Sequence, residues 1–465
     1  MYPMFLRLWM IVICCSIPGT LAAQELPFGI ALPPSLNFAV SPSPVGSGAR
    51  AAGKAFAFIG VADDATAASH NPGGLVQLQR PEATIVGSYF IQLERLDVNR
   101  RDTLVQEQSL DSANLNYLSV VYPFRLFRFN VVASLNFQRL FDLQGDTKVT
   151  SRFTSVEGIQ KVRSRQDGQL FAISPALAVE ITRRFSIGVA FNIWPDIFGN
   201  GWEQEVSVAG QGRVASGNRT VPFVSTGRIK EKYAFKGFNL TVGFLWEINP
   251  IWTLGGVFRS PFTAKVKRTH TSSITVTLQD GSASDTSQLS FSETLDMDMP
   301  LSYGLGLAVR PFPHRFQRLF IISLDVVRTH WSDFRLEKST RDNALLVENG
   351  APSGKGEAVL NSQGDDTTSV RLGAEYVLIR RNKISIPLRA GFFYDPEPSE
   401  RGTDDFFGFS LGTGIGTVTN RVSQVFSQQL ILDIAYTFRT GNAQSETTDT
   451  TVYQHTILAS VIYHF

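Results

Sequence analysis

Cysteine is almost absent from this sequence. The only two, Cys14 and Cys15, lie in the apolar run that follows Arg7. Arg7, this run and the small residues up to Ala23 have the charged, apolar and small order of a secretory signal peptide. We therefore expect a signal peptide at residues 1–23, with cleavage after Ala23. The mature chain then holds no cysteine, which excludes disulfide scaffolds and thiolate metal sites.

A long apolar segment and an excess of one charge are also missing. No run of 18 apolar residues follows the expected signal peptide, and the 43 basic residues are balanced by 41 acidic ones. The first absence argues against a spanning helix, and the second against a nucleic-acid partner. The six histidines show no metal-ligand spacing, so neither a metal site nor a cofactor is expected.

What the chain has instead is a repeated alternation of apolar with polar or small residues. In Val370–Leu378, for example, Arg371, Gly373 and Glu375 alternate with apolar side chains. On a strand the two sets face opposite ways, and a barrel can span a membrane in this manner without any long apolar run. Fourteen candidate strands begin near residues 83, 113, 128, 166, 184, 228, 251, 288, 318, 367, 383, 404, 426 and 451.

The connections between these strands alternate in length. The short ones are Pro123–Phe127, Thr182–Arg184, Asn249–Pro250, Pro311–Gln317 and Arg380–Asn382. The long, polar ones are Asp97–Ser112, Phe141–Arg165, Phe198–Gly227, His270–Ser287, Asp333–Asp366 and Gly441–Thr450. Short turns at one end, long loops at the other and an even strand number are typical of outer-membrane barrels. We therefore predict an all-β protein: a transmembrane antiparallel β-barrel of about 14 strands at residues 83–465, in the outer membrane of a Gram-negative cell.

The last strand, Tyr453 to Phe465, carries apolar residues at alternate positions and ends in an aromatic residue. This pattern resembles the signal that barrel-insertion machinery recognises, so we expect that machinery as a partner. Outer-membrane lipid and lipopolysaccharide are the other expected surroundings. Pairing of the first and last strands would leave no open edge.

The segment 24–82 differs from the rest because it is rich in Pro, Gly and Ala and does not alternate. Asp63 or Asp64 can cap a short helix, and the sequence Asn71-Pro72-Gly73-Gly74 enforces a turn. A compact, small-residue segment ahead of the first strand fits inside a barrel lumen. We predict a hatch, or plug, at residues 24–82.

Several of these motifs together resemble the FadL/TodX (OMPP1) family of outer-membrane transporters of long-chain fatty acids and other hydrocarbons. The motifs occur in the family's order at residues 48–53, 61–68, 71–75, 324–325, 331–334, 371–376, 388–395, 409–414 and 432–436. One departure lies in the hatch turn, where Gly73 stands in place of the family's usual Ala. The more permissive glycine can change how easily this turn moves.

The resemblance implies passive uptake of a hydrophobic molecule through a lumenal pocket, hatch movement and lateral release beside a kink in the third strand. That strand, about Arg128–Gln144, contains neither Gly nor Pro, so the sequence shows no kink. By parity six side chains should face inward: Asp325, Arg371, Glu375, Arg389, Phe393 and Asp433. Arg371 or Arg389 is then a candidate for binding a carboxylate head group; the alternative is that these charges only pair with one another across the lumen wall.

A second candidate site lies in the loop expected at Phe198–Gly227. Its four large apolar residues, Trp202, Val206, Val208 and Phe223, are candidates for an outer landing patch. The alternative is ordinary packing within that loop.

Three other functions are weighed. A general porin should have 16–18 strands and an open lumen, which the hatch and the strand count oppose. A scaffold or carrier for secreted proteins on the same fold is the alternative function. The sequence Gly408–Gly412 matches a hydrolase nucleophile elbow, with Asp433 and His455 after it, but no helix follows as that motif requires, so we do not expect an enzyme.

Overall fold

The computed structural model describes residues 43–44, 47–98, 103–104, 108–153, 158–216, 219–281, 284–311, 320–337, 365–381, 384–399, 402–417, 429–444 and 448–465. The expected signal peptide at 1–23 lies outside this part of the chain. Within it, no helix is both long and apolar enough to cross a membrane.

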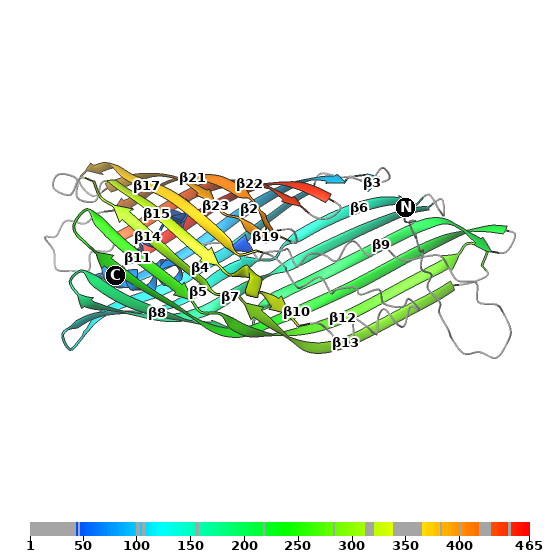
Figure 1. Cartoon of the computed structure of the whole chain (residues 1–465), viewed down its shortest axis with the longest axis horizontal. Helices are drawn as coiled ribbons and strands as arrows, with labels where there is room; N and C mark the ends of the chain where they lie inside the picture. Colours follow the sequence, from blue (N-terminus) through cyan, green and yellow to red (C-terminus); the bar gives the residue numbers. More distant parts are fainter. Residues whose placement is uncertain are drawn as a thin grey trace, which may run out of the picture.

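Fourteen antiparallel strands form a closed barrel (Figure 1). They are β2 (Glu82–Val98), β4 (Gln108–Leu126), β5 (Phe129–Asp142), β7 (Gly158–Thr182), β8 (Phe185–Trp194), β10 (Arg219–Glu247), β11 (Trp252–Arg259), β14 (Ser302–Val309), β15 (Phe320–Thr329), β17 (Thr367–Arg381), β18 (Ile384–Tyr394), β21 (Phe406–Thr417), β22 (Gln429–Gln444) and β23 (Thr448–His464). Each strand pairs with the next, and β23 pairs back with β2 from His464 opposite Glu82 onward. The predicted barrel and its strand number are confirmed.

The wall forms because its strands alternate between two kinds of side chain. On β14, Leu305 is 58% exposed on the outer surface, while Ser302 and Ala308 are buried on the inner one. On β21, Leu411 is 53% exposed, and the neighbouring Ser410 is buried. An apolar exterior around a polar or small-residue interior is the arrangement that hydrocarbon favours for a barrel.

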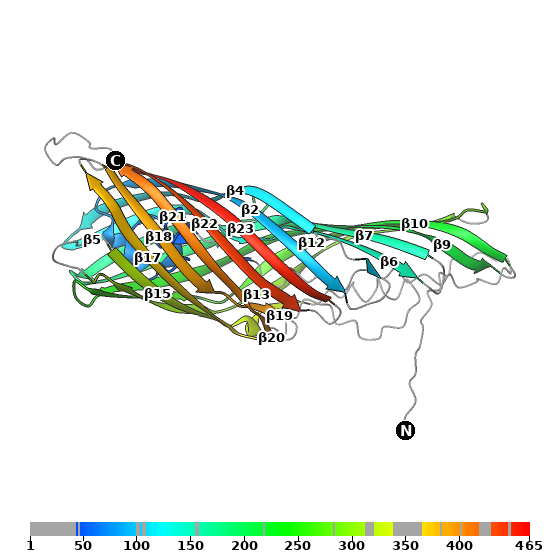
Figure 2. The same ribbon diagram turned by 90° about the horizontal axis from the view of Figure 1, so that it is seen from above.

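A sheet continues the wall beyond the barrel on one side, at the end opposite the short turns (Figures 1 and 2). Its strand order is β6 (Gly145–Phe153), the first half of β7, β9 (Gly201–Ser216), the first half of β10, β12 (Phe262–Leu278) and β13 (Ser284–Met299). We call these six strands the projecting sheet. Shorter strands are β1 (Ser43–Pro44), β3 (Thr103–Leu104), β16 (Arg335–Leu336), β19 (Glu397–Ser399) and β20 (Gly402–Asp404), and a short 3-10 helix, η2, spans Trp331–Asp333.

The projecting sheet corrects the prediction of long polar loops. The expected loops Phe141–Arg165, Phe198–Gly227 and His270–Ser287 are wrong, because these residues are largely strand. Gly441–Thr450 is also not a long loop, since β22 ends at Gln444 and β23 begins at Thr448. The reason is that a strand outside the membrane carries charged residues on its outward face. Such a strand lacks the apolar outward band of a membrane strand, so its sequence resembles that of a polar loop.

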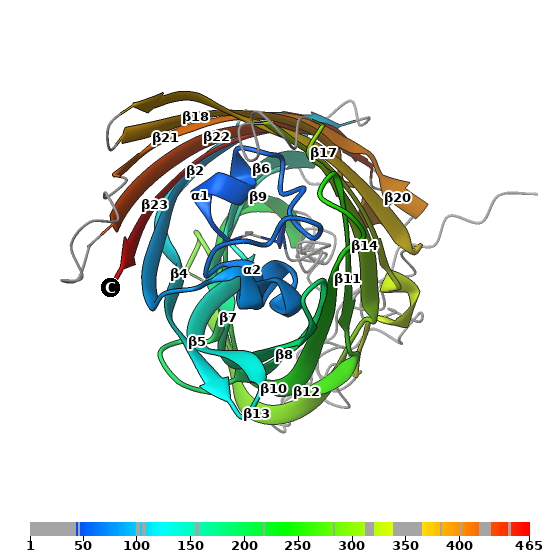
Figure 3. The ribbon, with the colours of Figure 1, turned by 90° about the vertical axis from the view of Figure 1, so that its left-hand side faces the viewer.

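Residues 47–78 lie inside the ring of strands, as the end-on view shows for α1 and α2 (Figure 3). This segment contains α1 (Ala49–Ala52), α2 (Ala67–His70) and the 3-10 helix η1 (Pro72–Gln77). Most of its apolar side chains are fully buried, including Phe58, Val61 and Leu75. We call residues 47–78 the inner segment.

Candidate functional site

Wall glycines allow the backbone of the inner segment to rest directly on the barrel. A Cβ added at Gly188 would lie 2.3 Å from the carbonyl oxygen of Pro72, and one at Gly255 would lie 2.2 Å from that of Ile59. The same close approach recurs at Gly306, Gly373 and Gly391. These glycines occupy inward-facing positions of the barrel strands, where a side chain would push the inner segment away.

The turn at Asn71 fixes the inner segment to this wall. The Asn71 side chain is buried, and its Nδ2 donates to the carbonyls of Ile59 at 2.9 Å and Phe244 at 2.8 Å. Its Oδ1 accepts from the amide of Gly73 at 3.0 Å. Ser186 Oγ on β8 donates to the Gly73 carbonyl at 2.7 Å. The predicted turn residues therefore form a hydrogen-bonded joint between the inner segment and two strands.

A chain of ion pairs joins α1 to the adjacent wall. Arg50 contacts Asp63 at 2.6 Å and Glu375 at 2.8 Å. Arg389 lies between Glu375 and Asp433, with both contacts at 2.6 Å. Glu375, Arg389 and Asp433 are each less than 7% exposed, so these charges face one another inside the barrel and not water. Three of the predicted inward residues thus belong to a network beside the inner segment.

Asp325 and Ser410 bind backbone amides of the inner segment. Asp325 Oδ2 accepts from Phe58 at 2.6 Å and from Ile59 at 2.8 Å. Ser410 Oγ accepts from the Ala55 amide at 2.8 Å. Ser410 faces inward from β21, whereas His455 bonds Tyr436 on the outer side of the wall. The two candidate residues of the elbow motif therefore lie on opposite faces of the barrel.

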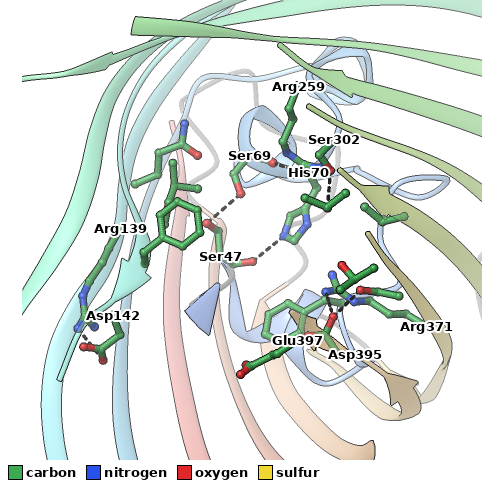
Figure 4. Close-up of a pocket in the computed structure, with 18 of the residues that line it drawn as sticks. Ser47, Ser69, His70, Arg139, Asp142, Arg259, Ser302, Arg371, Asp395 and Glu397 are labelled. Carbon is green, nitrogen blue, oxygen red and sulfur yellow. Dashed lines mark hydrogen bonds and ion pairs between the residues drawn. The ribbon is translucent and has the colours of Figure 1, made fainter. Parts of the chain in front are cut away.

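Between the inner segment and the projecting sheet the lumen holds a cavity of about 350 Å³ (Figure 4). One part of its wall is aromatic: Trp194 stacks on Phe262 with ring centroids 5.7 Å apart and on Phe141 at 6.2 Å. Phe393 and Asp325, both predicted to face inward, line it as well. Ser47, Ser69 and His70 of the inner segment contribute to the lining. His70 Nε2 lies 2.9 Å from the Ser47 carbonyl, and burial lowers the His70 pKa to about 4.

Four arginines line the cavity, and three of them have a carboxylate partner. Arg139 pairs with Asp142 at 2.7 Å, Arg371 with Asp395 at 3.2 Å and Arg439 with Glu397 at 2.7 Å. The side chain of Arg259, the last residue of β11, donates to the Ser69 carbonyl at 3.3 Å (Figure 4). Among the described residues it has no ion pair. It is therefore the guanidinium in this cavity whose charge is not neutralised by the protein.

Sequence reasoning missed Arg259, Arg139 and Asp395, although a local signal exists for Arg259. Arg259 has the same parity on β11 as the buried Thr253 and Val257. It could have been found by extending the parity argument to each charged residue at the end of a strand. Arg139 carries no such signal, because it has the same parity on β5 as the exposed Leu135. It is buried at the register irregularity that follows it, which only the structure shows.

The four residues of the predicted landing patch do not lie in a loop. Trp202, Val206 and Val208 belong to β9 and Phe223 to β10, and each is less than 8% exposed. Trp202 stacks on Tyr233 with centroids 4.4 Å apart. Val206 and Val208 pack with Val162, and Phe223 packs with Val221. All four face the inner side of the projecting sheet, on the side that continues the lumen.

The wall has a seam between β4 and β5. These strands pair from Leu126 opposite Phe129 up to Tyr117 opposite Gln138. Beyond that point, in the described part of the chain, β4 pairs only with β2. β5 has a register irregularity between Arg139 and Phe141 against β7, and then pairs with β1. A second cavity, of about 670 Å³, shares Arg139 and Gln144 with the first and reaches Asn114 on β4. The third strand thus carries an irregularity that its sequence does not reveal.

Comparisons with known proteins agree with this geometry. A family model described as outer membrane protein transport protein (OMPP1/FadL/TodX) matches residues 45–455. No curated protein sequence matches. A crystal structure of a Pseudomonas aeruginosa FadL homologue is 13% identical, with a TM-score of 0.55 and coverage of 91% of this chain and 100% of that chain. The CymD monoaromatic hydrocarbon channel is 15% identical, with a TM-score of 0.50 and coverage of 91% and 99%. At these identities the two structures show a shared fold.

Proposed function

The chain belongs to the outer membrane transport protein family OMPP1/FadL/TodX, and from this premise we propose that it is a passive channel for hydrophobic molecules with an anionic end, such as long-chain fatty acids. The substrate enters the cavity above the inner segment. That segment, within residues 24–82, acts as a hatch, and the substrate leaves sideways through the wall.

The hydrocarbon part of such a substrate fits the aromatic wall of the cavity. Trp194, Phe141 and Phe262 form a stacked apolar surface there. Transfer of a hydrocarbon chain from water to such a surface is favourable by roughly 0.8 kcal/mol for each buried CH₂ group. The inward apolar side chains of the projecting sheet, including Trp202 and Phe223, continue this surface away from the barrel. They support an outer capture site on the sheet in place of the loop first expected.

Arg259 is the single observation that carries the proposal of an anionic end. A guanidinium binds a carboxylate through two parallel N–H donors, and Arg259 has no carboxylate partner among the described residues. Arg389, one of the two arginines first considered, is held between Glu375 and Asp433. Arg371 is held by Asp395. A substrate carboxylate at Arg259 would lie beside the hatch and would neutralise a half-buried charge.

The seam between β4 and β5 supports a lateral exit. Beyond Tyr117 no backbone ladder joins the described residues of β4 to β5, and the edge of β5 pairs there with the two residues of β1. The second cavity connects Arg139, on the lumen wall, with Asn114 of β4. An apolar molecule that reaches this seam gains by moving into lipid, because transfer to hydrocarbon removes its surface from water. The hatch closes the lumen below this level, so a sideways path avoids its buried ion pairs.

Binding of radiolabelled oleate to the purified, detergent-folded barrel tests this function. We expect saturable oleate binding that toluene does not displace. An Arg259→Gln variant should bind oleate roughly 10-fold or more weakly, since hydrogen bonds to charged groups contribute about 1.5–3 kcal/mol, and should bind oleyl alcohol unchanged. Arg184→Gln, in an exposed turn at the far end, is the matched control.

Three outcomes would contradict the proposal in part or as a whole. Equal oleate binding by Arg259→Gln and the parent would refute the role of Arg259. Displacement by toluene would move the substrate toward aromatic hydrocarbons. If the folded barrel bound neither oleate, oleyl alcohol nor toluene, transport of hydrophobic molecules would be refuted in favour of the scaffold function.

A further inference from the structure

The outward face of β10 changes character where the strand leaves the barrel. Within the barrel its outward residues are exposed and apolar: Trp246, Val242 and Phe238. The next outward residues along the strand are Lys236 and, after Ala234, Lys232, both exposed. Residues of the opposite parity, such as Tyr233 and Phe235, stay buried on the inner side, so the strand does not rotate between the two regions.

The neighbouring strand β12 adds two lysines to the same face. Lys265 lies directly opposite Lys236, and Lys267 lies opposite Ala234. Their neighbours Ala264 and Val266 are buried on the inner side, so both lysines point outward. We call Lys232, Lys236, Lys265 and Lys267 the lysine cluster. It sits on the part of β10 and β12 that joins the barrel to the projecting sheet (Figures 1 and 2).

The protein neutralises only part of the cluster. Lys265 contacts Asp296 of β13 at 2.5 Å. In the described part of the chain, Lys232, Lys236 and Lys267 make no ion pair. Like charges directly opposite on neighbouring strands destabilise a sheet, and here two ammonium groups face each other at Lys236 and Lys265. An anion supplied from outside the chain would remove this repulsion.

The position of the cluster indicates where that anion comes from. Lys236 precedes Phe238 by two residues, so it lies about 7 Å along the strand from the last exposed aromatic residue at ~3.3–3.4 Å per residue. The exposed band that ends at Phe238 is the lipid-facing surface of the barrel. Residues one step beyond such a band lie at the level of the lipid head groups.

We propose that the lysine cluster binds the phosphate groups of a phosphorylated glycolipid in the outer leaflet. Each ammonium group is a compact charge with three donors and suits phosphate oxygens. Exposed lysines near an anionic lipid surface each contribute to membrane attachment. Bound lipid would anchor the projecting sheet at the membrane surface and fix its angle to the barrel. This inference does not depend on which molecule the lumen carries.

Native mass spectrometry of the detergent-folded barrel with diphosphorylated lipid A tests the proposal. The test variant is Lys232→Gln/Lys236→Gln/Lys267→Gln, which keeps Lys265 with Asp296. The matched control, Arg125→Gln/Arg183→Gln/Arg184→Gln, removes the same charge from exposed residues at the short-turn end. Retained heat-modifiability on denaturing gels shows that each barrel is folded.

We expect the test variant to bind lipid A at least 10-fold more weakly than the parent, and the control to bind like the parent. Parent binding should also weaken when salt is raised, because salt screens exposed charges. Equal binding by the test variant, or equal binding of dephosphorylated lipid A by the parent, would overturn the proposal. Competition by equimolar inorganic pyrophosphate, or tighter binding of an oligonucleotide, would show a site for soluble anions and would overturn the assignment to lipid.

Discussion

Replacing Asn71 by alanine should release the hatch while leaving the barrel intact. The Asn71 amide group makes three hydrogen bonds: to the carbonyls of Ile59 and Phe244, and from the amide of Gly73. One of the three crosses from the inner segment to β10, and the other two hold the turn at Asn71 closed. Alanine removes all three and adds no partner for these buried groups.

The size of the effect follows from this count. A hydrogen bond contributes about 1 kcal/mol net, and more when a buried group is left unpaired. Three lost bonds therefore destabilise the docked hatch by about 3 kcal/mol. At 1.4 kcal/mol for each factor of 10, the undocked population should rise roughly 100-fold. The barrel ladders themselves are untouched, so insertion and heat-modifiability should not change.

Hydrogen exchange of the folded protein, followed by mass spectrometry, measures this opening. Amides of Ala55, Phe58 and Ile59, which are bound by wall side chains, should exchange roughly 100-fold faster in Asn71→Ala. Peptides from β22 and β23 should not change. Uptake of oleate should fall, because Ser69 and His70 of the hatch line the cavity.

Asn249→Ala is the control, since Asn249 precedes Pro250 and its Oδ1 also caps amides, at 2.9 and 3.0 Å, but in a turn away from the hatch. Exchange in the hatch of Asn71→Ala as slow as in the parent would refute the reasoning about the joint. Normal uptake in a variant with a released hatch would show that this turn is not part of the gate.

Three further predictions concern other contacts that hold the inner segment against the barrel wall. Gly188→Val should displace the turn, because even a Cβ there would lie 2.3 Å from the Pro72 carbonyl oxygen; fast exchange confined to the hatch confirms it, and unchanged exchange contradicts it. Asp325→Ala should free two hatch amides at a cost of about 2 kcal/mol, while Asp325→Asn, which keeps an acceptor oxygen, should lose less; equal losses in the two variants, measured by the same exchange, would count against the hydrogen bonds. Because burial lowers the His70 pKa from 6.5 to about 4, its contribution to hatch docking is present above pH 6.5 and is lost as the pH falls toward 4. Exchange in the parent should therefore accelerate over that range more than in His70→Gln, and parallel pH profiles would refute a role for this histidine.

The predictions that came true rest on alternation along single strands. Asp325, Glu375, Arg389 and Asp433 were expected to face inward by parity, and all four are buried there. Parity could not tell which of them would pair, because pairing depends on strands that lie far apart in the sequence. Arg389 meets Asp433 across 44 residues and Arg50 meets Glu375 across 325. No local pattern records such distances.

The sequence by itself determined that the chain is a closed β-barrel of 14 strands, because side-chain period and turn position are local properties that the membrane enforces strand by strand. It did not determine how far the strands extend outside the membrane. Outside the membrane, lipid no longer requires an apolar outer face on a strand. The sequence of β9 is therefore polar on that face, and it was predicted to be a loop. Only the tertiary structure decided that Arg259 is left without a carboxylate partner among the described residues, that β4 and β5 part above Tyr117, and that lysines of β10 and β12 face each other. The physical reason is the same in each case, since charge balance and strand register are set by neighbours that only the closed barrel brings together.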